Sequence, residues 1–150
     1  DLDKALDLAF GYSETALVDE YVKGTEVTCG ILGNKKLEPL PLVEIIPRKS
    51  SFFDYQSKYL EGGAKEIVPA RISKKLTLRI QEIALAVYRL IGCKGFSRVD
   101  FILKNNREPL VLEINTIPGL THMSLLPKAA KAAGISYSQL IDRIIRYVLR

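Results

Sequence analysis

Two short runs of this sequence carry side chains that could bind a hard cation and a developing negative charge. Arg98 and Asp100 lie two positions apart, and Glu113 and Asn115 have the same spacing. Side chains at this spacing share one face of a β-strand. Carboxylate and amide oxygens suit Mg²⁺, which usually takes one or two carboxylates together with phosphate oxygens. A guanidinium beside them could stabilise a developing oxyanion.

The residues between these runs predict a β-hairpin. Asn105 and Asn106 tolerate the left-handed conformations of tight turns, and they separate two strand-like runs. A turn centred between them places Arg98 opposite Glu113, with Asp100 diagonal to Glu113 and within reach of a shared ion. The other face would be core, formed by Val99, Phe101, Leu112 and Ile114. The alternative is a solvated hairpin face with an ordinary cross-strand ion pair, and the hairpin alone favours neither.

A longer segment carries a family resemblance. Arg98-Val-Asp100, followed by Glu113-Ile-Asn-Thr-Ile-Pro-Gly119, resembles the metal-binding core of ATP-grasp ligases. The run that continues through Leu-Thr-His-Met-Ser-Leu-Leu-Pro127 is similar to D-alanine–D-alanine ligases, and the similarity covers the whole chain. The resemblance implies an α+β fold, with helices packed against an antiparallel sheet. It also identifies residues 1–150 as a C-terminal ATP-grasp domain, with the N-terminal and central domains outside this sequence.

The resemblance implies roles for the hairpin and the residue that follows it. The metal ligands would be Asp100, Glu113 and Asn115. They would hold two magnesium ions, for which manganese could substitute. Arg98 and the backbone N–H of Gly119 would form an oxyanion hole, since glycine lets the backbone approach the substrate closely. The alternative for Gly119 is an ordinary turn before a capped helix.

The loop after the hairpin leads into a predicted helix. Thr121 or Ser124 can cap a helix that runs to Ala133, and the free N–H groups at a helix start can bind a carboxylate. The resemblance places the carboxylate of the second substrate on Ser124 and on the backbone of Leu125. His122 is the only histidine, and we assign it no chemistry.

The N-terminal third predicts a helix over residues 2–11 and then strands over 16–22, 26–32 and 41–46. A turn at Lys23-Gly24 would pair the first two strands. In ATP-grasp ligases the corresponding pair of strands forms the adenine pocket. The resemblance places the adenine contacts on Asp19, Glu20, Tyr21 and Val22. It places the ribose contact on Glu26, although a lone glutamate is more often a surface carboxylate.

Residues 48–63 interrupt the strand pattern with aromatic and small polar residues and a glycine pair. A loop of this length is either disordered or functional. In the resembling ligases the corresponding loop closes over ATP, with Lys58 and Tyr59 at the closed site. Ester-forming relatives typically differ at the tyrosine, so Tyr59 favours D-alanine as the second substrate. The alternative is an aromatic-rich surface loop with a solvated lysine.

The later segments predict a short strand and three helices. Residues 64–69 form the strand, and Ser73 caps a helix over 74–91 that stops at Gly92. The helix after the hairpin comes next. A capping box at Ser136 then opens the last helix, which runs to the C-terminus.

Composition limits the remaining function classes. The chain has 150 residues, 47% of them apolar and 26% charged, which is typical of a soluble single domain. The net charge of +5 suits an anionic ligand such as a nucleotide. Basic residues do not cluster with aromatics, so nucleic-acid binding is not expected. No apolar run could span a membrane, and the two cysteines indicate buried thiols in a reducing cytoplasm.

The resemblance implies ATP-dependent ligation of two D-alanine molecules through an acyl phosphate, for peptidoglycan synthesis, and it allows a homodimer of the full-length enzyme. Two alternatives stay open. One is another ATP-grasp carboxylate–amine ligase that uses a different amino or hydroxy acid, and the other is a non-catalytic nucleotide-binding fragment. The phosphate-binding loop of the family lies upstream. We therefore expect this chain, which does not begin with Met, to be a fragment that folds without catalysing ligation alone.

Overall fold

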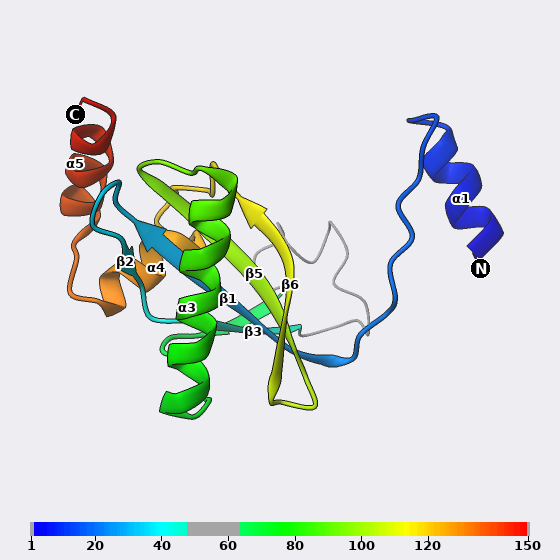
Figure 1. Cartoon of the computed structure of the whole chain (residues 1–150), viewed down its shortest axis with the longest axis horizontal. Helices are drawn as coiled ribbons and strands as arrows, with labels where there is room; N and C mark the ends of the chain where they lie inside the picture. Colours follow the sequence, from blue (N-terminus) through cyan, green and yellow to red (C-terminus); the bar gives the residue numbers. More distant parts are fainter. Residues whose placement is uncertain (1, 48–63, 150) are drawn as a thin grey trace.

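One antiparallel sheet forms the centre of the molecule, with helices on both faces (Figure 1). The computed structural model describes residues 2–47 and 64–149. Within these ranges the strands are β1 (Gly24–Leu32), β2 (Glu38–Pro39), β3 (Val43–Pro47), β4 (Ala64–Ile67), β5 (Phe96–Lys104) and β6 (Glu108–Asn115). The helices are α1 (Leu2–Phe10), α3 (Lys74–Ile91), α4 (Leu125–Ala132) and α5 (Tyr137–Val148). The strand order is β4-β3-β1-β5-β6, β2 pairs with the end of β1, and every pairing is antiparallel, so the predicted α+β class is confirmed.

The two faces of the sheet belong to different cores, because side chains alternate along each strand. The face covered by α3, which we call the α3 face, includes Val27, Cys29, Ile31, Ile80, Ala84, Tyr88, Val99 and Phe101. The opposite face, which we call the α4 face, has its core beneath α4 and includes Leu32, Leu40, Val43, Leu126, Ala129 and Ala130. Cys29 is buried, as predicted, and burial raises the pKa of its thiol to about 12, whereas Cys93 is only half-buried and does not match the prediction.

The helix α3 matches the predicted helix, and both predicted ends are confirmed. The Ser73 hydroxyl accepts a hydrogen bond from Leu76 N at 3.3 Å, and Gly92 ends the helix in the left-handed conformation with φ of 72°. Tyr88 is buried and donates its hydroxyl to the Gly33 carbonyl at 2.8 Å. Each large side chain buried here contributes about 1.5–3 kcal/mol, so α3 holds this face of the sheet firmly.

The helix α4 lies close to the sheet because Gly30 has no side chain. A Cβ atom at Gly30 would be 2.6 Å from Leu126 Cδ1 and 3.0 Å from Leu40 Cδ1. An ion pair between Lys128 of α4 and Glu66 of β4 also joins the helix to the sheet. These contacts hold α4 against β1 and β4.

The N-terminal helix α1 confirms the prediction, but it buries no residue and stands away from the sheet (Figure 1). The predicted strand over residues 16–22 is wrong, since this segment is extended without strand pairing. Its expected partner is β1, which from Glu26 to Thr28 already pairs with β3 on one edge and β5 on the other. No edge of β1 is left for a further strand there. None of the helices in the described ranges combines the length and the apolar character needed to cross a membrane.

The turn of the β5–β6 hairpin contains one residue more than predicted. Asn105 and Asn106 adopt the predicted left-handed conformation, with φ of 53° and 56°. However, Lys104 pairs with Glu108, so Arg107 also belongs to the turn. The register of the hairpin therefore differs from the predicted one.

A β-bulge changes the register again, in the middle of the hairpin. Phe101 pairs with Val111, whereas its neighbour Asp100 pairs with Glu113, which leaves Leu112 as the extra residue of the bulge. The prediction that Leu112 is core is wrong, because its side chain is 57% exposed. The bulge instead brings Glu113 directly opposite Asp100.

Candidate functional site

Three polar side chains form a row across the α4 face of the sheet. Thr28 of β1 pairs with Asp100 of β5, and Asp100 pairs with Glu113 of β6. The two carboxylates are directly opposite, where Cβ atoms lie about 4.5–5.5 Å apart, and not diagonal as expected. The Thr28 hydroxyl donates a hydrogen bond to Asp100 Oδ1 at 2.6 Å. The bulge therefore places two carboxylates side by side with a buried hydroxyl beside them.

Arg98 lies on the same strand and the same face as Asp100, and it binds that carboxylate through two hydrogen bonds. Its Nε donates to Oδ1 at 2.8 Å, and its Nη2 donates to Oδ2 at 2.7 Å. The predicted position of Arg98 opposite Glu113 is wrong, since the longer turn and the bulge place Asn115 opposite Arg98. The side chains of Arg98 and Asp100 are only 16% and 18% exposed, so water screens their attraction weakly.

Glu113 and Asn115 supply the remaining predicted metal ligands. The Glu113 side chain is exposed and makes no hydrogen bond or ion pair with the described residues, while Asn115 Oδ1 accepts from Ile117 N at 3.1 Å. No group of three or more His, Cys, Asp or Glu side chains within the described ranges could hold a metal alone. Two carboxylates and an amide fit Mg²⁺, which takes its other oxygen ligands from phosphate and water. The donor set therefore suits a cation that arrives with a phosphate ligand.

Gly119 and Ser124 are in contact at the start of α4. A Cβ atom at Gly119 would lie 2.8 Å from Ser124 Oγ, so a larger residue would displace the serine. Ser124 occupies the N-cap position and Leu125 begins the helix, but the serine makes no side-chain cap hydrogen bond. Its hydroxyl pairs with Thr121 Oγ1 at 2.8 Å and accepts from Thr121 N at 3.2 Å. The first N–H groups of α4 therefore lack the side-chain cap that was predicted from Thr121 or Ser124, which leaves them suited to a carboxylate.

The loop before α4 is held from the other side by α5. Tyr137 donates its hydroxyl to the Leu120 carbonyl at 2.9 Å, and its ring lies 4.0 Å from the His122 ring. Tyr137 is the first residue of α5, which begins with the predicted capping box of Ser136 and Gln139. His122 thus has a packing partner within the fold.

Glu26, the predicted ribose ligand, is half-buried on the α4 face. It pairs with Ile45 of β3 on one side and with Ile102 of β5 on the other. Thr28 follows two positions later on the same face. This alternation was the only sequence signal for Thr28, to which the sequence analysis assigned no role.

The predicted adenine contacts lie in the extended segment before β1: Asp19, Glu20, Tyr21 and Val22. The first three side chains are exposed and the fourth is half-buried. The segment leads directly into the strand that carries Glu26, so the two predicted parts of a nucleoside site are continuous in the chain. The predicted lid residues Lys58 and Tyr59 lie outside the described residues.

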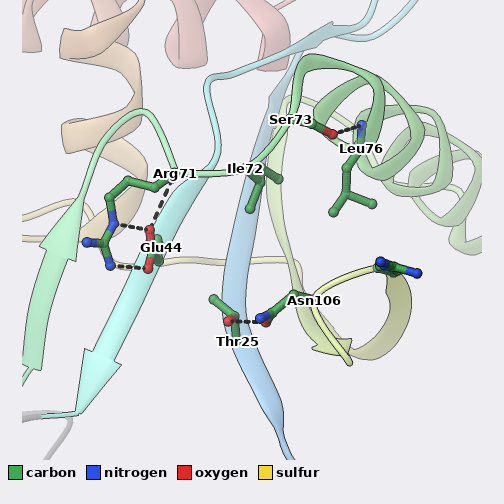
Figure 2. A pocket seen from close by; sticks show the side chains of 8 residues that line it. Thr25, Glu44, Arg71, Ile72, Ser73, Leu76 and Asn106 are labelled. Carbon is green, nitrogen blue, oxygen red and sulfur yellow. Dashed lines mark hydrogen bonds and ion pairs between the residues drawn. The ribbon is translucent and has the colours of Figure 1, made fainter.

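A cavity of about 710 Å³ lies on the α3 face, and Figure 2 shows the residues that line it. Glu44 of β3 accepts hydrogen bonds from Arg71 Nη2 at 2.7 Å, from Arg71 Nε at 3.0 Å and from the Arg71 backbone at 3.1 Å. These bonds hold the pKa of Glu44 below its usual range. Thr25 donates to Asn106 Oδ1 at 2.8 Å on another side of the cavity. The lining shares no residue with the row on the α4 face, so this cavity is separate from the candidate site.

A family model described as D-ala D-ala ligase C-terminus matches residues 1–146, which include the whole row on the α4 face and the start of α4. The chain belongs to the D-alanine–D-alanine ligase family. It is similar to the D-alanine–D-alanine ligase of Syntrophobacter fumaroxidans, with 46% identity over 149 residues, covering 99% of this chain and 48% of the relative. The ligase of Halalkalibacterium halodurans is 43% identical over 152 residues, covering all of this chain and 50% of the relative.

Solved structures of the family have the same fold. The D-alanine–D-alanine ligase of Bacillus anthracis, solved in complex with ATP, matches 99% of this chain and 47% of its own, with a TM-score of 0.82 and 39% identity. VanG, a D-Ala:D-Ser ligase of Enterococcus faecalis, matches 97% of this chain and 42% of its own, with a TM-score of 0.82 and 40% identity. The chain spans about half the length of the curated relatives it matches, and it corresponds to their C-terminal domain.

Proposed function

We propose that this chain is the catalytic C-terminal domain of an ATP-dependent D-alanine–D-alanine ligase, which joins two D-alanine molecules for peptidoglycan synthesis. The observation that carries the proposal is the row on the α4 face. It places Asp100 directly opposite Glu113, with Arg98 on the same strand and face as Asp100. Paired carboxylates with a guanidinium beside them suit a phosphoryl-transfer site. The names of the relatives and the ATP complex of one of them support the same substrates.

In this proposal Asp100, Glu113 and Asn115 hold two magnesium ions, for which manganese can substitute. The bound ions would neutralise the phosphate charge of ATP. The Glu113 side chain has no hydrogen-bond or ion-pair partner among the described residues, so it can bind a cation without losing an existing interaction. The proposed nucleoside contacts are the segment from Asp19 to Val22 for adenine and Glu26 for the ribose.

The ligation would proceed in two displacements. A carboxylate oxygen of the first D-alanine attacks the γ-phosphorus of ATP, and ADP leaves. The amine of the second D-alanine then attacks the carbonyl carbon of the acyl phosphate, loses a proton, and phosphate leaves. Arg98 and the Gly119 N–H would stabilise the oxyanion of the second step. The start of α4, at Ser124 and Leu125, would hold the carboxylate of the second D-alanine.

The test uses the chain joined to the N-terminal half that its relatives possess, which we call the extended ligase. Asp100→Asn and Glu113→Gln should each lower D-alanine-dependent phosphate release from ATP by about 10²–10³-fold, because the cation loses a charged ligand. Far-UV circular dichroism should change little. The matched control is Glu108→Gln, which removes an exposed carboxylate from β6, the strand that also carries Glu113. Near-normal turnover of both site variants at limiting magnesium would refute the proposal.

A second candidate function is the same ligation with a different second substrate, the acceptor that attacks the acyl phosphate. The likeness to VanG, a D-Ala:D-Ser ligase, has the same TM-score as the likeness to the B. anthracis ligase, so the fold does not separate the two acceptors. The same phosphate-release assay, run with D-serine in place of the second D-alanine and with product analysis by mass spectrometry, separates them. Preference for D-serine would assign the chain to the second class.

Homodimerisation of the extended ligase is also part of the proposal, and sedimentation velocity measures the oligomeric state.

A further inference from the structure

Thr28 occupies an unusual position for a buried hydroxyl. Only 1% of the residue is exposed, and it lies at the centre of the sheet between Val43 and Asp100. Its Oγ1 is 3.2 Å from the Val99 carbonyl and 2.6 Å from Asp100 Oδ1. A hydroxyl has one proton, and the shorter contact has the length of a charge-assisted O–H···O⁻ bond. The proton therefore belongs mainly to the contact with Asp100.

Burial alone does not explain this choice of partner. A buried hydroxyl needs one acceptor, and the Val99 carbonyl is already within reach. The Asp100 carboxylate does not need Thr28 to neutralise its charge either, since Arg98 binds both of its oxygens. What Thr28 adds is a third bond from a different strand, and that bond acts with the two from Arg98 to hold the carboxylate in one rotation.

The three bonds also make the two oxygens of Asp100 unequal. Among the described residues, Oδ1 accepts from both Thr28 and Arg98 Nε, whereas Oδ2 accepts only from Arg98 Nη2. Each carboxylate oxygen has about two acceptor positions. Oδ1 is therefore saturated and Oδ2 keeps one position. A cation at this site would meet Oδ2, while Oδ1 stays bound to the protein.

We propose that Thr28 is a positioning residue for the metal-binding carboxylate, and that it acts by holding Asp100 Oδ1 so that Oδ2 faces the cation. This inference rests on the proposed function, in which Asp100 binds magnesium. Groups that orient a metal ligand typically change metal affinity about 10–100-fold when they are removed. Thr28 makes no contact with the cation itself, so its removal should weaken cation binding without abolishing the reaction at saturating magnesium.

The experiment measures binding of Mn²⁺ to the extended ligase with ADP present, by electron paramagnetic resonance of the free ion. Thr28→Val keeps the shape of the side chain and removes the hydroxyl, and it should raise the dissociation constant for Mn²⁺ about tenfold. Thr28→Ser keeps the hydroxyl and should stay within about twofold of the unsubstituted protein. In turnover assays the half-saturating magnesium concentration should rise for Thr28→Val, while turnover at saturation changes much less.

Thr25→Val is the matched control. Thr25 lies on the same strand, and its hydroxyl also donates one hydrogen bond, but that bond goes to Asn106 on the other face. Thr25 is less buried than Thr28, so the control should lose less stability, and it should leave the Mn²⁺ affinity unchanged. If Thr28→Val does not fold, the pair Thr28→Ser and Thr28→Ala serves instead, because these two variants differ only in the hydroxyl.

The outcomes separate the inference from the proposed function. Unchanged Mn²⁺ affinity in Thr28→Val, together with weakened affinity in Asp100→Asn, would mean that Asp100 binds the cation and Thr28 only packs. Unchanged affinity in Asp100→Asn would remove the proposed metal site itself, and the inference with it. Equal affinities for Thr28→Ser and Thr28→Ala would also overturn the inference, since the hydroxyl would then have no effect.

Discussion

Two carboxylates in the sheet are each bound by an arginine through two side-chain hydrogen bonds, and they lie on opposite faces. On the α3 face, Glu44 of β3 binds Arg71, which precedes α3. On the α4 face, Asp100 and Arg98 belong to the same strand. The first pair joins separate parts of the chain, whereas the second joins residues that β5 already holds together. We therefore expect the first pair to stabilise the fold, whereas the second agrees with the proposed role in ligand binding.

The surroundings of the two pairs support this difference. Glu44 pairs in the sheet with apolar residues on both sides, Val27 and Ile67. Asp100 has Glu113 directly opposite it. Carboxylates in directly opposite positions of a sheet can share a cation, and Arg98 already offsets the charge of Asp100, so Glu113 is the carboxylate left for a ligand. A second carboxylate opposite the ion pair sets the Asp100–Arg98 pair apart from the Glu44–Arg71 pair and agrees with the proposed cation site.

The largest effect that separates the two pairs should appear in turnover. Arg98→Gln in the extended ligase should lower turnover about 10²–10³-fold, because it removes a cationic donor from the developing oxyanion. Arg71→Gln should leave turnover at saturating substrates nearly unchanged, since the cavity on the α3 face shares no residue with the row. Steady-state phosphate release measures both variants. A comparable loss in the two would show that the α3 face also serves the reaction and would remove the distinction.

The next effect should appear in stability. Glu44→Gln should lower the free energy of unfolding by about 1–3 kcal/mol, since three hydrogen bonds to a buried carboxylate are lost or weakened. The lower end is expected, because the Arg71 side chain is 62% exposed and water screens the ion pair. Asp100→Asn should also lower stability, because it weakens three hydrogen bonds and removes the negative charge that the half-buried Arg98 binds. Urea denaturation measures both.

Glu38→Gln is the control for this comparison. Glu38 forms an ion pair with Arg143, and both side chains are 40% or more exposed. Exposed pairs contribute about 0–1 kcal/mol, so this variant sets the baseline for loss of a surface interaction. A loss for Glu44→Gln no larger than that baseline would show that the α3-face pair does not hold the fold.

The local parts of the fold were predictable because their causes lie in neighbouring residues. Ser73 and Gly92 mark the ends of α3, and Asn105 and Asn106 mark the hairpin turn, through backbone preferences that a few residues determine. The strand expected over residues 16–22 has the right composition but no partner. The edges of β1 that would receive it are taken by strands from elsewhere in the chain, which local composition cannot reveal.

The candidate site was predictable only in part, for a related reason. The shared face of Asp100 and Glu113 follows from alternation, but the partner of Arg98 depends on the register, and a slip of one residue changes every pair. The bulge that sets the register lies between Val111 and Glu113, where both Val111 and Leu112 are apolar and the pattern does not alternate. Thr28 was missed because its role depends on a strand far away in the sequence.

The smallest effect that distinguishes the two faces concerns acid stability. Arg71 lowers the pKa of Glu44 from its ordinary value of 4.5, chiefly through the side-chain hydrogen bonds. Glu44 therefore binds a proton more weakly in the folded protein than in the unfolded chain. The stability that this shift provides is fully present above the ordinary pKa, and it is lost as the pH falls through the lowered pKa of the folded state.

Glu44→Gln removes this titration, so the stability difference between the unsubstituted protein and the variant should shrink as the pH falls below 4.5. The change should stay below about 1 kcal/mol, because Arg71 is largely exposed. Urea denaturation of both proteins at several pH values measures it. Arg71→Gln removes the cause of the pKa shift, so the stability difference between the unsubstituted protein and this variant should also shrink as the pH falls. A stability difference that stays constant down to about pH 3 would show that the pair contributes through packing and neutral hydrogen bonds. The α3-face pair would then hold the fold without depending on the charge of its carboxylate, and charge would cease to distinguish it from the pair on the α4 face.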